Sequence, residues 1–161
     1  MADQNNIIVG AATLAIDGVD IGYTQGGVTF RKSTEYVDVD ADQLGGVARK
    51  VPTFERFFVS TTLLEATRAN MQKILNEPAS NLGGSTLAFG EGTITSSEHV
   101  LTVVGKAPNS GTRTYTFYRA ISVDDVEHVI GARDAPGMIP AGFELLKDPA
   151  NKNRTGHFVD T

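Results

Sequence analysis

The stretch Gly26-Gly27-Val28-Thr29-Phe30, continued by Thr34-Glu35-Tyr36-Val37-Asp38-Val39-Asp40-Ala41-Asp42, decides the fold of this chain. Apolar and polar residues alternate along it with period two, which is typical of a β-strand with one packed face and one wet face. Residues 43–52 contain Gly45-Gly46 and predict a flexible loop. A second strand is expected from Thr53 to Leu64, so the segment predicts a long hairpin with a long tip.

The second half of the chain repeats this pattern. Residues 98–106 and 113–123 predict two strands, and the segment between them contains Pro108, Asn109 and Gly111, which favour a turn. A last strand is expected over residues 137–146. The chain is therefore expected to be mainly β, a β-sandwich or partial barrel built from two long hairpins.

One segment favours an α-helix, over residues 65–76. Leu64, Met71, Ile74 and Leu75 fall on one stripe of it, as on a helix that packs against a sheet. Thr62-x-x-Glu65 matches a capping box at its start. In the long hairpin, Val37, Val39 and Ala41 are expected to pack against this stripe.

Composition limits the classes of function. The chain has 161 residues, a net charge of −5, no cysteine and no tryptophan, and 7% of its residues are aromatic. A protein that binds nucleic acid tightly usually presents a basic face that neutralises phosphates, and one that stacks single strands presents an aromatic platform. Neither is expected here. Disulfides are impossible without cysteine.

No motif of a catalytic or metal site is complete. Asp38-x-Asp40-x-Asp42 imitates a calcium loop, but Gln43 replaces the glycine at its sixth place and Arg49 the acid at its twelfth. The three histidines are isolated, and no Gly-x-Ser-x-Gly nucleophile elbow occurs. We therefore expect neither an enzyme nor a bound cofactor or metal.

A single domain over residues 1–161 is expected from the length. Within it, residues 1–12 and 148–161 are expected to form terminal arms and residues 42–52 the long hairpin loop. The start is polar, and no apolar run approaches the ~18 residues of a membrane span. Synthesis and maturation in the cytoplasm are expected.

Several short motifs recur in the order found in one protein family. They are Ile16-Asp17-Gly18, Ile21-Gly22, Gly26-Gly27-Val28, Asp42-Gln43-x-Gly45, Thr62-Leu63-Leu64-Glu65, Arg119-Ala120-Ile121-Ser122-Val123 and Ile139-Pro140-Ala141-Gly142-Phe143-Glu144-Leu145-Leu146-Lys147-Asp148. In this order, from Ile7 to Asp148, the chain resembles the tail tube (major tail) proteins of bacteriophages and of related contractile, tailocin-like injection particles. Each motif is loose, so the resemblance depends on their succession along the whole length.

The resemblance implies a virion tail protein whose copies form hexameric rings. The rings would stack into a hollow tube closed as a β-barrel, through which duplex DNA passes without specific binding. It also implies sheath, tail-tip or baseplate initiator, tape-measure and tail-terminator proteins as partners. Ring closure would cover strand edges that a monomer leaves unpaired.

Two sets of residues are candidates for the tube surfaces. The lumen-lining candidates are Tyr36, Asp38, Asp40, Asp42, Ser60, Thr62, Thr114 and Thr116. The candidates for contacts between rings are Leu44, Gly45, Gly46, Val47, Arg49, Lys50 and Val51. An acidic lumen would repel DNA phosphates and let the duplex slide.

Two other functions remain open. The chain would equally suit the inner tube of a headless contractile injection system or bacteriocin, which carries no DNA. A protein of another class, a monomeric β-barrel that binds a ligand in an apolar interior, would show no self-assembly.

Overall fold

The computed structural model describes residues 10–41, 45–90, 97–128 and 137–161, and within them the protein is mainly β with one α-helix, as predicted. The strands are β1 (Thr13–Ile16), β2 (Val19–Asp20), β3 (Thr24–Ala41), β4 (Gly46–Leu63), β5 (His99–Lys106), β6 (Thr112–Ser122), β7 (Ile139–Leu145) and β8 (Gly156–Asp160). The helix α1 spans Arg68–Ile74. Short 3-10 turns occupy Ala79–Asn81, Pro108–Ser110 and Pro149–Asn151.

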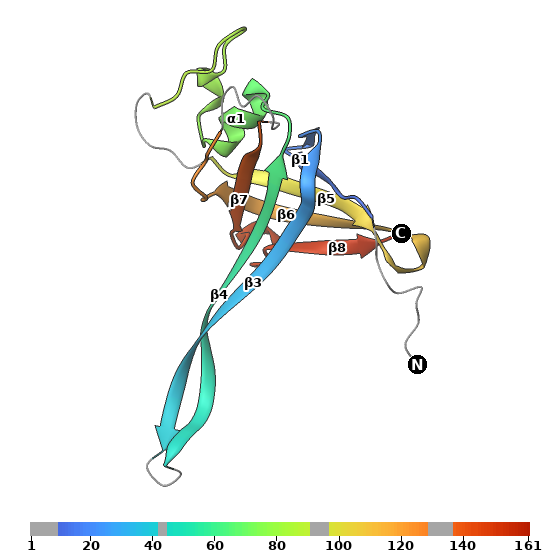
Figure 1. Cartoon of the computed structure of the whole chain (residues 1–161). Coiled ribbons are helices and arrows are strands. Elements are labelled where there is room, and N and C mark those ends of the chain that lie inside the picture. Colours follow the sequence, from blue (N-terminus) through green and yellow to red (C-terminus); the bar gives the residue numbers. More distant parts are fainter. Residues whose placement is uncertain (1–9, 42–44, 91–96, 129–136) are drawn as a thin grey trace.

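All eight strands belong to one antiparallel sheet. Its order is β2-β1-β5-β6-β7-β4-β3, and β8 pairs with the first half of β6. The sheet curls, so that β5, β6 and β8 cross beneath β3, β4 and β7, and α1 covers one end of it (Figure 1). Both predicted long hairpins are present, as β3–β4 and β5–β6.

The core lies inside this curl. It consists of apolar side chains from five strands, the segment after β2 and the helix. Its members are Leu14, Ile16, Ile21, Val59, Leu63, Ile74, Leu101, Val103, Phe117, Ala120, Ile139, Ala141, Phe143 and Leu145. The ring of Phe30 packs at 5.4 Å from that of Phe117, which joins β3 to β6 across the curl. Burial of these side chains is the main source of stability for the body of the protein.

The β3–β4 hairpin is longer than predicted. Residues 46–52, expected to be loop, belong to β4, and Gly45 turns the chain with a φ of 62°. The register shifts at three places, one of them beside Gly26 and Gly27, which both have positive φ. Each shift adds unpaired residues to one strand, which lets the ribbon keep pairing while it bends and twists. Residues 42–44 of the predicted loop, including Asp42 and Leu44, lie outside the described residues.

The helix is shorter than predicted. Thr67, not Thr62, caps it, because the Thr67 hydroxyl accepts a hydrogen bond from the Asn70 N–H at 3.2 Å. Thr62 belongs to β4, so the capping-box prediction was wrong. Asn70 is buried and its side-chain amide donates to the carbonyl of Ile21 at 2.9 Å, which fastens the helix to the segment after β2.

The expected C-terminal arm, residues 148–161, contains strand β8 and is joined to the sheet. Arg113 of β6 holds Asp160 through two hydrogen bonds of 2.6 Å. This pairing lowers the pKa of Asp160 below its usual range. The expected N-terminal arm, residues 1–12, lies outside the described residues except for residues 10–12.

Gly156 limits how closely β8 can approach β6. A side chain at this position would overlap the carbonyl oxygen of Thr116 and come within 2.8 Å of the ring of Phe117. We predict that Gly156→Ala lowers the free energy of unfolding by about 1–3 kcal/mol, as overpacking against backbone does. Gly84→Ala, whose added carbon meets nothing within 4 Å, is the matched control in urea unfolding. Equal midpoints for the two variants would contradict this.

Candidate assembly surface

The outer part of the β3–β4 hairpin, residues 31–41 and 45–56, is called the arm. β7 pairs with β4 only from Phe57 to Leu63, so the arm is a two-stranded ribbon that extends away from the body (Figure 1). The side chains of its apolar residues Val37 and Val39 are 53% and 46% exposed. The prediction that they pack against the helix stripe was wrong, because the arm points away from α1. The side chain of Ala41 is not described.

One face of the arm carries charges that neutralise each other. Lys32 of β3 pairs with Glu55 of β4 at 2.5 Å, and Asp38 of β3 pairs with Lys50 of β4 at 2.8 Å. Asp38 and Lys50 are directly opposite in the strand register, whereas Lys32 and Glu55 are diagonal neighbours, and all four residues are exposed. We call this side, which also carries Tyr36, Asp40 and Val47 by alternation, the paired face. Exposed pairs of this kind contribute only about 0–1 kcal/mol each.

The opposite face carries arginines without such partners. Arg31, Arg49 and Arg56 make no ion pair in the described part of the chain. The guanidinium of Arg31 lies 4.6 Å from the ring centre of Phe58, and that of Arg56 lies 5.0 Å from that of Phe54. We call this side, completed by Ser33, Glu35, Val37, Val39 and Val51, the arginine face. It combines net positive charge with exposed apolar surface.

The candidate lumen residues do not lie on one side of the sheet. Tyr36, Asp38 and Asp40 lie on the paired face by strand alternation, whereas Ser60 and Thr62 of β4 lie on the same side of the sheet as the arginine face. On β6, Thr114 and Thr116 alternate with Tyr115 and Phe117, whose rings pack toward Phe30. These threonines therefore also lie on the side away from the core. The lumen assignment stays a prediction.

The candidates for contacts between rings are at the tip of the arm. Gly45, Gly46, Val47, Arg49 and Lys50 are all exposed, and Val51 is half-buried. Lys50, one of these candidates, is already paired with Asp38 of its own arm. Of the two basic residues near the tip, Arg49 is the one on the arginine face.

Long strand edges are unpaired in the described residues. β3 is the last strand in the sheet order, so its outer edge has no partner from Thr24 to Ala41. The outer edge of β4 is also unpartnered along residues 46–56, beyond its pairing with β7. Rows of unpaired backbone N–H and C=O groups are templates for another strand.

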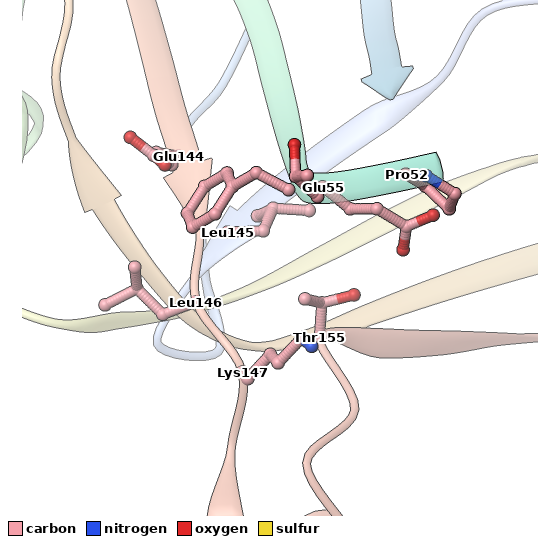
Figure 2. A pocket seen from close by; sticks show the side chains of 9 residues that line it. Pro52, Glu55, Glu144, Leu145, Leu146, Lys147 and Thr155 are labelled. Carbon is pink, nitrogen blue, oxygen red and sulfur yellow. The ribbon is translucent and has the colours of Figure 1, made fainter. Parts of the chain in front are cut away.

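A cavity of about 420 Å³ lies at the base of the arm (Figure 2). It forms where β4 separates from β7, and it is bounded by both strands and by the segment before β8. Its lining residues are Pro52, Thr53, Phe54, Glu55, Glu144, Leu145, Leu146, Lys147 and Thr155. The cavity thus adjoins the free edge of β4, where an added peptide or a small ligand would find both apolar and charged walls.

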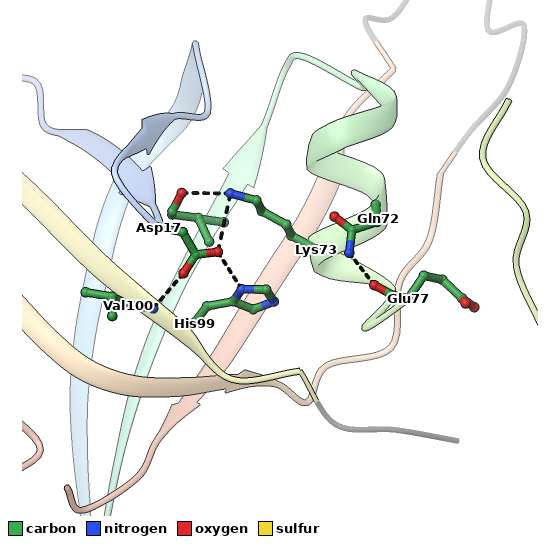
Figure 3. A network of polar contacts seen from close by, with 7 residues as sticks. Asp17, Gln72, Lys73, Glu77, His99 and Val100 are labelled. Carbon is green, nitrogen blue, oxygen red and sulfur yellow. Dashed lines mark hydrogen bonds and ion pairs between the residues drawn. The ribbon is translucent and has the colours of Figure 1, made fainter. Parts of the chain in front are cut away.

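At the end of the body away from the arm, a polar network fastens the helix α1 to the β1–β2 turn and to the start of β5 (Figure 3). Asp17, in the β1–β2 turn, accepts hydrogen bonds from His99 Nδ1 at 2.8 Å and from the Val100 N–H at 3.0 Å. Lys73 of α1 lies 3.5 Å from the same carboxylate and donates to the carbonyl of Ile16 at 2.7 Å. Burial opposes ionisation of Asp17, but the hydrogen bonds and neighbouring charges outweigh it, so its pKa is lowered.

The described residues contain neither a group of metal ligands nor a membrane-spanning helix. Among the described residues, no three His, Asp or Glu side chains are grouped so as to hold a metal ion. In the same part of the chain, no helix has the length and apolar character that crossing a membrane requires.

Comparison with known proteins shows a likeness of fold. The structure is similar to a chain in the cryo-electron microscopy structure of the anti-feeding prophage baseplate, which is six-fold symmetrised. The TM-score is 0.52, and the match covers 99% of this chain and 97% of that one at 9% sequence identity. No protein-family model and no curated protein match the sequence.

Sequence reasoning missed the arginine face and the Asp17 network. Arg49 falls in phase with Arg31 and Arg56 only because the register shifts between Glu35 and Tyr36. His99 and Asp17 are 82 residues apart, and nothing in the sequence signals their contact. The Asp-Gly turn at Asp17 was visible, but it indicated only a hairpin.

The Asp17 network predicts a dependence of stability on pH. Because the folded pKa of Asp17 lies below the unfolded value of about 3.9, its contribution is complete above that value. The contribution is lost as the pH falls through the folded pKa. We therefore expect Asp17→Asn to lower the free energy of unfolding at pH 7, and its deficit relative to the original protein to shrink as the pH falls below about 3.9. Asparagine tolerates the φ of 53° found there.

Denaturant unfolding of both proteins between about pH 7 and pH 2 measures this difference. The matched control is Asp125→Asn, which removes an exposed carboxylate that makes no ion pair in the described residues. We expect the control to change stability little at any pH. A deficit of Asp17→Asn that stays constant down to pH 2 would refute the role of the ionised carboxylate.

Proposed function

We propose that this protein is a structural subunit of a phage tail tube, in which copies form six-membered rings that stack into a hollow tube conducting DNA. Its role is structural and needs no catalytic residue or cofactor. It would be assembled in the host cell, with the sheath, tail-tip and terminator components of the particle as neighbours. The observation that carries the proposal is the arm, together with the unpaired edge of β3.

The arm is difficult to explain in an isolated subunit. Two-stranded ribbons without a third strand or a packed face are at best marginally stable in water. Here the arm leaves Val37, Val39 and Phe54 about half exposed, and it buries none of the core residues. Pairing and packing with other copies would cover both the apolar side chains and the strand edge.

The fold likeness supports the same proposal. The similar chain comes from a baseplate with six-fold symmetry, and nearly the whole of both chains is matched. At 9% identity this likeness concerns the fold, and the step to a tube subunit rests on the arm, the free edges and the order of sequence motifs. The net charge of −5 per chain would make a ring strongly acidic, which suits a tube that does not bind DNA.

Two observations favour other functions. The same fold likeness is to a prophage baseplate, so a tube of a headless contractile injection particle is the second candidate. The cavity at the base of the arm favours a monomeric protein that binds a small ligand, since ligand sites commonly span about 300–1,000 Å³.

Negative-stain electron microscopy of the concentrated protein, with its mass in solution, tests the proposal. We expect rings or hollow fibres and masses that are multiples of six subunits. An arm-shortened variant, with residues 35–54 replaced by Asn-Gly between the paired residues Thr34 and Glu55, is the matched control. It should unfold cooperatively and form no fibres.

A tube subunit can require an initiator before it polymerises. A second experiment therefore adds a preformed tail-tip complex to the protein. Fibres that appear only then still support the proposal. Protein that stays monomeric at every concentration and with the complex present would contradict it and favour the ligand-binding alternative.

A further inference from the structure

The two faces of the arm differ in how their charges are satisfied. On the paired face, each lysine is paired with a carboxylate of the other strand, Lys50 with Asp38 directly opposite and Lys32 with Glu55 diagonally. On the arginine face, the one carboxylate is Glu35, which stands opposite Phe54 in the register and makes no ion pair in the described residues. The arm therefore compensates its charge on one side and presents net positive charge on the other.

The arginine face is also ordered for contact. The rings of Phe58 and Phe54 hold the guanidinium groups of Arg31 and Arg56 by cation–π stacking, so less side-chain freedom remains to be lost on binding. Between the arginines, the side chains of Val37 and Phe54 are 53% and 51% exposed. Charged groups around exposed apolar residues are typical of a protein interface rather than of a solvated face.

The same chain carries a surface of opposite character on its body. Asp124, Asp125 and Glu127 follow β6, are exposed, and make no ion pair within the described residues. Val123 beside them is 43% exposed. The end of β6 adjoins the helix, since the Asn76 amide donates to the Ser122 carbonyl at 2.8 Å. The Val123 N–H donates to the Gly142 carbonyl at 3.0 Å, and Gly142 pairs with Ser60 of β4, so the segment lies on the body, from which the arm extends away (Figure 1).

We propose that the arginine face of one copy docks on the acidic segment 123–127 of a second copy. Arg31 and Arg56 would pair with Asp125 and Glu127, and the exposed valines and Phe54 would pack against Val123. Exposed ion pairs alone are weak, so the apolar contact must supply much of the affinity, while the charges set orientation and exclude wrong partners. Because the arginine face meets a different surface on the second copy, one such contact leaves an arginine face and an acidic segment unoccupied, to which further copies can add.

This inference rests on the proposed tube function and names the contact that joins successive copies along it. It is separable from that function, because head-to-tail contacts can exist without a six-membered ring. The charges themselves suggest the test, since each surface can be reversed independently. Asp124 is left unchanged, because its carboxylate packs on the backbone of Gly142 and a change there would disturb the fold.

Two variants are compared by sedimentation velocity at low ionic strength. The first is Arg31→Glu with Arg56→Glu, and the second is Asp125→Arg with Glu127→Arg. In either variant alone, like charges meet at every contact, so we expect self-association to weaken at least about tenfold. In an equimolar mixture every contact between unlike variants pairs opposite charges, and association should return. Lys106→Glu with Lys152→Glu, outside both surfaces, is the charge-matched control and should assemble normally.

Several results would overturn the inference. They are variants that assemble as well as the original protein, a mixture that stays dissociated while circular dichroism shows both variants folded, or an original protein without self-association.

Duplex DNA is tested as a competitor. If the original protein binds DNA but does not self-associate, and DNA binding is lost in Arg31→Glu with Arg56→Glu, the arginines bind a polyanion instead of a second copy. Tubes that persist in both variants would refute this contact but leave the proposed function intact. Linear assemblies that depend on these charges but contain no rings would support this contact and contradict the proposed tube function.

Discussion

The structure depends on how strands β3 and β4 satisfy their backbone hydrogen bonds. Each has the other as a partner along the whole hairpin, but only residues 57–63 of β4 have a second neighbour, in β7. Inside that limit the strands share a buried core, and outside it they form a ribbon with two open edges. A ribbon of this kind gains little from burial and is marginal alone. The division between a stable body and a dependent arm follows from this single change in pairing.

The body of the protein is stabilised by contacts within the subunit. The core side chains fill the curl of the sheet, Asn70 and the Asp17 network fasten the helix, and Arg113 fastens the C-terminal strand. The arm differs, because the charges of its paired face are paired within the subunit, whereas those of its arginine face are not. The surface that remains unsatisfied in the subunit is therefore the surface on which the assembly proposals are built.

Much of the fold was predictable because strand alternation is a local signal. Both long hairpins, the single helix and the mainly β class follow from periodicity and turn residues. The extent of the arm was not predictable. Gly45-Gly46 and Pro52 suggested a loop, but residues 46–52 belong to β4, and a register shift beside Thr53 lets the two strands keep pairing. The helix start was misplaced because Thr62 and Thr67 both suit an N-cap, and only strand pairing removes Thr62.

The candidate surface was predictable only in part. The acidic residues of β3 were evident, but the pairing of Asp38 with Lys50 requires the register of the two strands, which the sequence does not give. The arginine face is hidden for the same reason, because Arg31 and Arg56 are 25 residues apart and lie near each other only through strand pairing. Contacts between distant segments decide both faces, and they depend on tertiary structure.

Hydrogen exchange of the outward-pointing amides of β3, measured in the free subunit and in the assembled particle, tests the central claim most directly. We expect those amides to exchange rapidly in the free subunit, where no strand covers them, and to become at least about a hundredfold slower on assembly. The amides that pair with β4 serve as the internal reference. If the outward-pointing amides exchange equally fast in both states, the free edge is not an assembly surface and the account is wrong.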